Sequence, residues 1–220
     1  MEGLVIYCAD IGSVQKNNFA WARLPYAKVE GFSPGGSRQS IQDLATAVAA
    51  DLQRGSKVAL GFECPLFVPL PDHPEKLTAA RQGEGDRPWS AGAGASCLAT
   101  GLTETVWILE RIRARLTRTP PVYLDWRSFV EATEGLFFWE AFVTQDSKLS
   151  SNEDDAETAV TYFESAMPKV DEHDAVRNDR VRSLIGAAIL QAGWSTNLNL
   201  LAEPCLVLRP PAPRARLKIG

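Results

Sequence analysis

A short apolar run near the start of the chain restricts its fold more than any other segment. Leu4 to Ala9 is β-branched and apolar, which is typical of a buried strand, and Asp10 to Ser13 reads as the turn that ends it. A carboxylate that directly follows a buried strand is costly to desolvate unless it meets a ligand or a partner. Because open α/β sheets bind ligands at the carboxyl ends of their strands, we expect this strand to carry Asp10 to such an edge.

Composition and charge fit one soluble domain. With 220 residues, 45% of them apolar, the chain can bury a sizeable core. Its apolar runs fall short of the roughly 20 residues that span a bilayer, and it lacks a signal-peptide pattern, so we expect a cytoplasmic protein without membrane contact. The four cysteines form no C-x-x-C pair, which argues against a zinc site. A net charge of -4 leaves any nucleic-acid contact to local basic patches.

The first third of the chain predicts strands around one helix. Two more strands are expected over 18–23 and 27–32, and with the first they would form an antiparallel meander. Apolar residues then recur at helical spacing over 41–52, and the apolar segment 57–63 follows as a strand. A strand, helix, strand unit favours parallel pairing. We therefore expect an α/β fold with a mixed central sheet, antiparallel at its start and parallel further on, flanked by helices.

The remaining segments complete a domain over 1–208. A long loop insertion is expected at about 65–94, where five prolines interrupt any periodicity, and an extended Pro/Arg-rich tail over 209–220. Apolar spacing predicts further helices, and the next core strand is left open between two short segments. The expected helices cover 98–116, 151–167 and 181–192, and the two strand candidates are 122–124 and 129–131.

Acidic residues follow several of the expected strands. Asp10, Glu63 and Glu131 stand at or near the ends of apolar segments, and Asp174 or Asp179 near the start of the last helix could add a fourth carboxylate. Converging carboxylates are unfavourable unless a hard divalent cation neutralises them, which points to Mg²⁺ or Mn²⁺. Two such cations would suit the hydrolysis of a phosphodiester. The alternative interpretation is local, since aspartates also start turns and cap helices.

Other side chains are candidates for substrate contact, with nucleic acid as the expected partner. Trp89 stands beside Arg87 in the long loop, and arginines recur near the last helix and in the tail, where they could form a phosphate-binding strip. The expected substrate-binding residues are Ser13, Lys16, Arg87, Trp89 and Arg182.

Three short motifs carry a family resemblance. Asp10 to Ser13, followed by Phe19 to Ala22, resembles the opening hairpin of RNase H-like proteins. Gly61 to Leu66 is similar to the acid-x-Pro-Leu segment of the domain of unknown function 429 family, a predicted nuclease of that superfamily. Val130 to Phe137 resembles that family's Glu-Ala-Tyr-Pro segment. The resemblance implies an RNase H-like fold and metal-dependent nuclease activity.

The sequence also departs from that family pattern. Arg182 stands where the family's last carboxylate is expected, and Thr133-Glu134 replaces Tyr-Pro. Either Asp179, about one helical turn earlier, supplies the missing ligand, or the site is incomplete and the protein binds rather than cuts.

Two further classes of enzyme share single features with this chain. The segment Asp10 to Ser13 is similar to the phosphate loop of the sugar kinase and actin superfamily, but those ATPases need a second domain with its own loop. A thiol enzyme could use Cys64 with His73 or His173. A lone cysteine at a strand end is more often inert.

Overall fold

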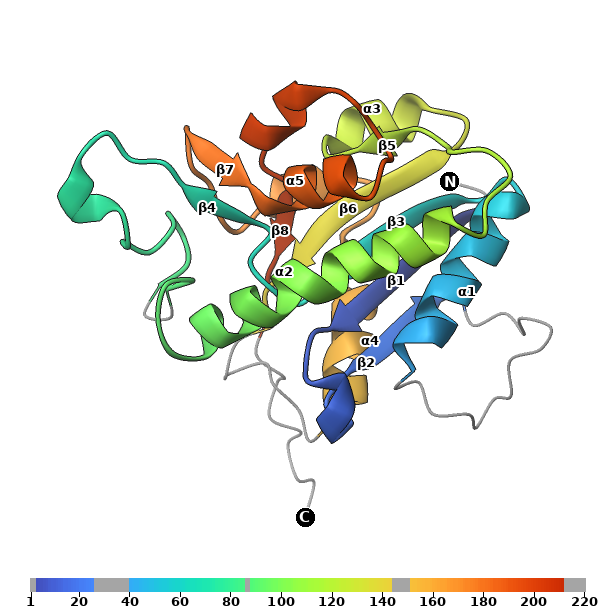
Figure 1. The fold of residues 1–220 in the computed structure, drawn as a ribbon, viewed down its shortest axis with the longest axis horizontal. Helices are drawn as coiled ribbons and strands as arrows, with labels where there is room; N and C mark the ends of the chain where they lie inside the picture. Colours follow the sequence, from blue (N-terminus) through green and yellow to red (C-terminus); the bar gives the residue numbers. More distant parts are fainter. Residues whose placement is uncertain (1–2, 26–39, 86–87, 144–150, 212–220) are drawn as a thin grey trace, which may run out of the picture.

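The computed structural model describes residues 3–25, 40–85, 88–143 and 151–211. The strand expected over 27–32 and the candidate Arg87 lie outside these described residues, as does most of the expected tail. Within them, the chain is an α/β protein with a mixed sheet flanked by helices, as the sequence predicted (Figure 1). No helix of the described part is long and apolar enough to cross a membrane.

The main sheet joins one antiparallel pair to a parallel set. Its strands run in the order β2-β1-β3-β6-β5, and β8 also pairs with β6. Only β2 is antiparallel to its neighbour, so the carboxyl ends of the other strands share one edge. The bounds are β1 (Leu4–Asp10), β2 (Ala20–Leu24), β3 (Lys57–Phe62), β5 (Val122–Tyr123), β6 (Gly135–Ala141) and β8 (Leu206–Leu208). A separate two-stranded sheet pairs β4 (Phe67–Pro69) with β7 (Val181–Ser183).

Helices cover both faces of the main sheet, and each face has its own apolar core. One core joins the sheet to α1, α2 and α5, and the other joins it to α3 and α4 (Figure 1). The long helices are α1 (Ile41–Gln53), α2 (Gly92–Arg113), α4 (Asn152–Ala166) and α5 (Leu184–Gln191), and α3 (Trp126–Glu131) is short. Short 3-10 helices are Val14–Lys16, Pro74–Lys76, Val170–His173 and Leu198–Ala202.

All of the α-helices in the described part of the chain except α2 begin at a residue whose side chain caps them. The Ser40 side chain accepts a hydrogen bond from the Asp43 N–H at the start of α1, and Ser151 does the same for Asp154 in α4. The α1 segment ends at Gly55, whose positive φ of 79° is a backbone conformation that favours glycine. The predicted helices over 41–52, 98–116 and 151–167 are confirmed, with boundaries that differ by up to six residues. The predicted helix over 181–192 is confirmed only from Leu184 onward, because Val181–Ser183 form the strand β7.

One strand prediction was wrong. Residues 129–131, a candidate core strand, belong to helix α3, which Asp125 caps by accepting a hydrogen bond from the Ser128 N–H at 2.8 Å. The central strand is instead β6, which pairs with β3 along its length and is buried throughout. A strand that is buried on both faces has a continuous apolar sequence, so it lacks the alternation that marks half-exposed strands. The other candidate, 122–124, contains the short strand β5.

Candidate functional site

Asp10 and Glu63 lie side by side at the carboxyl edge of the sheet. Strands β1 and β3 are parallel, with Ala9 opposite Phe62. The Glu63 N–H then donates to the Ala9 carbonyl at 2.8 Å, so the residue after β3 sits next to the last residue of β1. Both carboxylate residues are buried. The sequence prediction of a shared strand edge for these two acids therefore agrees with the fold.

The third carboxylate comes from helix α4. Asp155 lies in the first turn of this helix, on the face that also buries Ala159 and Phe163 against β1 and β2. The side-chain amide of Asn152 donates a hydrogen bond to the Asn18 carbonyl at 2.7 Å, which ties the start of α4 to the connection between β1 and β2. This contact holds the first turn of α4 close to the strand that ends at Asp10.

Asp10, Glu63 and Asp155 together form what we call the carboxylate cluster. One ligand oxygen from each lies within 4.8 Å of the other two, and all three residues are buried. Hard divalent cations prefer carboxylate oxygens at about 2.0–2.6 Å, so oxygens on opposite sides of one cation are roughly 4–5 Å apart. The donor chemistry, the burial and the spacing of the cluster thus fit a divalent cation.

Glu104 of α2 adds a fourth carboxylate next to the cluster. Burial and the charge of Asp10 raise the pKa of Glu104 to about 7, against a hydrogen bond from the Gly12 N–H that lowers it. Gly12 has no room for a side chain, because a Cβ there would lie 2.1 Å from the Asn18 carbonyl oxygen. The tight turn after β1 thus offers a backbone donor to Glu104 beside Asp10.

The other buried carboxylates of the described residues are neutralised by arginines. Arg81 donates to Glu140 at 2.8 Å and to Glu84 at 3.1 Å, and Arg23 donates to Asp51 at 3.0 Å. Together with the carboxylate cluster these acids make six buried carboxylates in the described part of the chain. The cluster differs from these pairs in gathering three carboxylates at one point.

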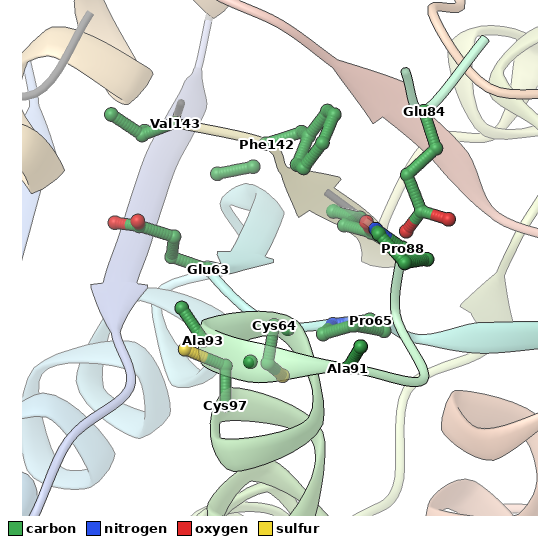
Figure 2. A pocket seen from close by; sticks show the side chains of 14 residues that line it. Glu63, Cys64, Pro65, Glu84, Pro88, Ala91, Ala93, Cys97, Phe142 and Val143 are labelled. Carbon is green, nitrogen blue, oxygen red and sulfur yellow. The ribbon is translucent and has the colours of Figure 1, made fainter. Parts of the chain in front are cut away.

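A cavity of about 400 Å³ adjoins the cluster at Glu63. It lies between the carboxyl ends of β3 and β6 and the first turn of α2, and we call it the α2 cavity. Figure 2 shows Glu63 at one side of it, Phe142 and Val143 above, and Ala93 and Cys97 below. Pro65, Pro88 and Ala91 close the side away from Glu63.

Three of the acids predicted from sequence lie elsewhere. Glu131 is exposed at the end of α3 and precedes β6, so it stands at the opposite edge of the sheet from Asp10. Asp174 accepts a hydrogen bond from the Val207 N–H at 3.0 Å and so helps to fix β8. Asp179 is exposed just before β7. The structure brings together only Asp10 and Glu63 of the predicted set.

The predicted substrate-binding residues are dispersed. Ser13 is half-buried in the turn after β1, and Lys16 is exposed at the end of the short 3-10 helix that follows this turn. The indole of Trp89 donates to the Ala79 carbonyl at 3.0 Å, which ties the last part of the long loop to its middle. Arg182 is exposed on β7 beside a smaller cavity of about 120 Å³ near α2 and α5.

Sequence reasoning missed Asp155 and Glu104, although both have a signal in the sequence. Asp155 precedes the buried residues Ala159 and Phe163 by four and eight positions, which places it on the apolar face of its helix. Glu104 precedes the buried Ile108 by four positions in the same way. Leu102 fits the apolar spacing of this helix but is 48% exposed, so the buried face of α2 is rotated toward Glu104.

The cysteines do not have the surroundings of catalytic thiols. Burial raises the pKa of the Cys64 thiol, and the charge of Glu140 raises it further. Burial also raises the pKa of the Cys8 thiol, with added effects of Glu63 and Asp10. A nucleophilic cysteine needs a lowered pKa. The environment of Cys64 therefore gives no support to the thiol-enzyme alternative.

Comparison of the chain with protein-family models, with curated proteins and with solved structures found no match.

Proposed function

We propose that the protein is a metal-dependent hydrolase of phosphodiesters with an RNase H-like fold. The observation that carries the proposal is the carboxylate cluster, in which Asp10, Glu63 and Asp155 turn ligand oxygens toward one point while buried. When bound there, Mg²⁺ or Mn²⁺ would activate water and stabilise negative charge on a phosphate. The chain's part in this chemistry is to hold the three carboxylates and to keep bulk water away.

The fold supports the RNase H-like relationship. An antiparallel β1–β2 pair is followed by parallel β3 and β6, and two of the acids follow the carboxyl ends of adjacent strands. The third acid comes from a helix packed over β1 and β2. Under this proposal α4 supplies the helical carboxylate, so Arg182 on β7 does not replace it. The departure noted in the sequence then concerns a different segment of the chain.

Glu104 would act as an acid or base in this site, and Gly12 would position it. The Gly12 N–H fixes the Glu104 carboxylate near Asp10, where it can accept a hydrogen bond from water or hold a proton near neutral pH. A nuclease needs this type of group to deliver a proton to the leaving oxygen or to remove one from water.

Calorimetric titration of Mn²⁺ and Mg²⁺ into the protein tests the cation site. We expect Asp10→Asn, Glu63→Gln and Asp155→Asn each to weaken Mn²⁺ binding by at least about tenfold, because each removes a charged ligand. Asp154→Asn and Glu131→Gln are the matched controls, since one neighbours Asp155 and the other lies at the far edge of the sheet. Equal loss in the controls and the cluster variants would reject a specific site.

Hydrolysis is tested with single-stranded, duplex and branched DNA and RNA. We expect a cleavage product that depends on Mg²⁺ or Mn²⁺ and that disappears in Asp10→Asn and Asp155→Asn but persists in Asp154→Asn. Carboxylate-dependent metal binding without cleavage of any substrate would instead favour a binding protein that has kept the fold and the metal site but not the reaction.

A further inference from the structure

The α2 cavity has the size of a site for one small molecule. Its volume is about 400 Å³, and pockets for small ligands span about 300–1,000 Å³. It shares Glu63 with the carboxylate cluster, so a ligand in the cavity would touch the residues that we propose to hold a cation. A duplex is too large to enter this space, whereas a single nucleotide unit is of the right size.

Away from Glu63 the cavity walls are apolar except for Glu84 and Glu140, whose carboxylates accept hydrogen bonds from Arg81. Phe142 and Val143 continue from β6 on one side, and Pro65 and Pro88 line the side opposite Glu63 (Figure 2). The guanidinium of Arg209 lies 4.4 Å from the centre of the Phe142 ring and holds this ring in place. Flat apolar walls of this type favour an aromatic base, because a bare sugar would need several polar partners.

The amino end of α2 forms one wall of the cavity. Ala91 caps the helix without a side-chain hydrogen bond, and the first turn contains no acidic residue. The first N–H groups of a helix have no partner within it, and its dipole favours negative charge there. Gly94 passes so close to Pro88 that a Cβ would lie 2.6 Å from the Pro88 carbonyl oxygen, so the chain keeps this turn free of side chains beyond a methyl group.

We infer that the α2 cavity binds one nucleotide unit, with its base between Phe142 and the prolines and its phosphate between Glu63 and the amino end of α2. The unit is either a free nucleotide or the end of a single strand, since both present the same base and phosphate. This inference rests on the proposed function, because a cation at the carboxylate cluster would offset the charge of Glu63 beside the phosphate. The apolar walls would then contact the base, the amino end of α2 would contact the phosphate, and a cation at the adjoining carboxylate cluster would lie beside that phosphate.

Calorimetry with adenosine 5′-monophosphate, adenosine and inorganic phosphate, each in the presence of Mg²⁺, tests this site. We expect the monophosphate to bind at least about tenfold more tightly than either fragment, because adenosine lacks the phosphate and inorganic phosphate lacks the base. Ala93→Leu places a larger side chain in the cavity and should weaken monophosphate binding by about tenfold or more, with Mn²⁺ affinity unchanged. Ala99→Leu, which is exposed on the same helix outside the cavity, should change neither.

A second variant and a competitor make the result decisive. Phe142→Leu, on the opposite wall, should also weaken monophosphate binding, and circular dichroism checks that both variants are folded. A short single-stranded oligonucleotide that displaces the monophosphate identifies a strand end as the ligand, whereas failure to displace it identifies the free nucleotide. Monophosphate binding that is absent, or is unchanged in folded Ala93→Leu and Phe142→Leu, overturns the inference.

The two proposals fail in different ways. If Mn²⁺ binds and strands are cut while the monophosphate does not bind, only the inferred cavity site is rejected. If Mn²⁺ binding does not depend on the carboxylates, the hydrolase proposal is rejected, and the monophosphate titration still decides the cavity. Saturable binding that Ala93→Leu abolishes would then support a nucleotide-binding cavity without hydrolysis.

Discussion

Two groups of buried carboxylates lie near the same edge of the sheet and differ in what gathers around them. Glu84 and Glu140 both bond to Arg81, and all three residues are almost completely buried. In the carboxylate cluster, oxygens of three acids converge within 4.8 Å. Burial of an acid therefore does not by itself mark a functional site. The groups that face the acid decide between an internal ion pair and a place for a cation.

The electrostatics of Arg81 illustrate the first case. Burial lowers the pKa of the guanidinium, but the charges and hydrogen bonds of Glu140 and Glu84 outweigh it and raise the pKa. The carboxylates and the guanidinium thus keep each other charged in the interior. Such a group is stable only as a whole, because removal of one member leaves an uncompensated charge.

The largest effect is expected from Arg81→Met. This change leaves Glu84 and Glu140 buried without the guanidinium, and we expect the free energy of unfolding to fall by about 3–5 kcal/mol. Urea denaturation followed by circular dichroism measures this change. A loss below about 1 kcal/mol would mean that water or other groups can replace Arg81, and the contrast between the two sites would no longer hold.

Glutamine substitutions at Glu140 and Glu63 should have opposite signs in protein treated with a chelator. Glu140→Gln removes a partner of Arg81 and should destabilise by about 2–3 kcal/mol. Glu63→Gln removes one of three like charges and should stabilise by about 1 kcal/mol. Addition of Mn²⁺ should raise the melting temperature of the wild type and of Glu140→Gln, but not of Glu63→Gln. If both variants change stability in the same direction without metal, Glu63 and Glu140 do not differ in the way proposed.

The pH dependence of stability should report Glu104 in the metal-free protein. Its folded pKa of about 7 exceeds the ordinary value of 4.5, mainly because of burial, so the folded state binds more protons between these values. Its contribution to stability is therefore fully present below pH 4.5 and is lost as the pH rises through 7. We expect the free energy of unfolding of the wild type, measured by urea titration, to fall between pH 5 and pH 7 by about 1 kcal/mol more than that of Glu104→Gln. The difference is small because the half-buried carboxylate is partly screened by solvent.

The smallest effect is expected from Arg180→Ala. Arg180 pairs with Asp72, but both side chains are largely exposed, unlike Arg81 and its partners. Solvent screens exposed pairs, so the free energy of unfolding should change by less than about 0.5 kcal/mol. A loss comparable to that of Arg81→Met in the same urea experiment would show that these substitutions report something other than the burial of their charges.

Local patterns predicted the helices α1, α2 and α4 and the first strand because those signals lie within one segment. The apolar spacing over 41–52 and the buried run ending at Asp10 need no knowledge of neighbours. The strand β6 was missed because it is buried on both faces and its start was interpreted as part of a family motif. Glu131 was misplaced for the same reason. It precedes β6, so it lies at the amino edge of the parallel strands and not at the carboxyl edge with Asp10.

The candidate site could be predicted only in part, because it depends on contacts between distant segments. Asp10 and Glu63 were found since each directly follows its own strand. Asp155 joins them only because α4 packs over β1 and β2, and the acidic first turn of that helix also fits a solvated surface. Arg81 and Glu140 are 59 positions apart, and no local pattern in the long loop indicates that an arginine there is buried.

Arg81 also bears on any attempt to shorten the chain. The loop over 65–94 resembles a surface insertion that an engineer would replace with a tight turn, but it delivers a residue of the interior. Removal of the loop would leave Glu140 in the middle of the sheet without its guanidinium and would take away Pro88 from the wall of the α2 cavity. A minimal version of this protein must therefore keep the loop or substitute Glu140 at the same time.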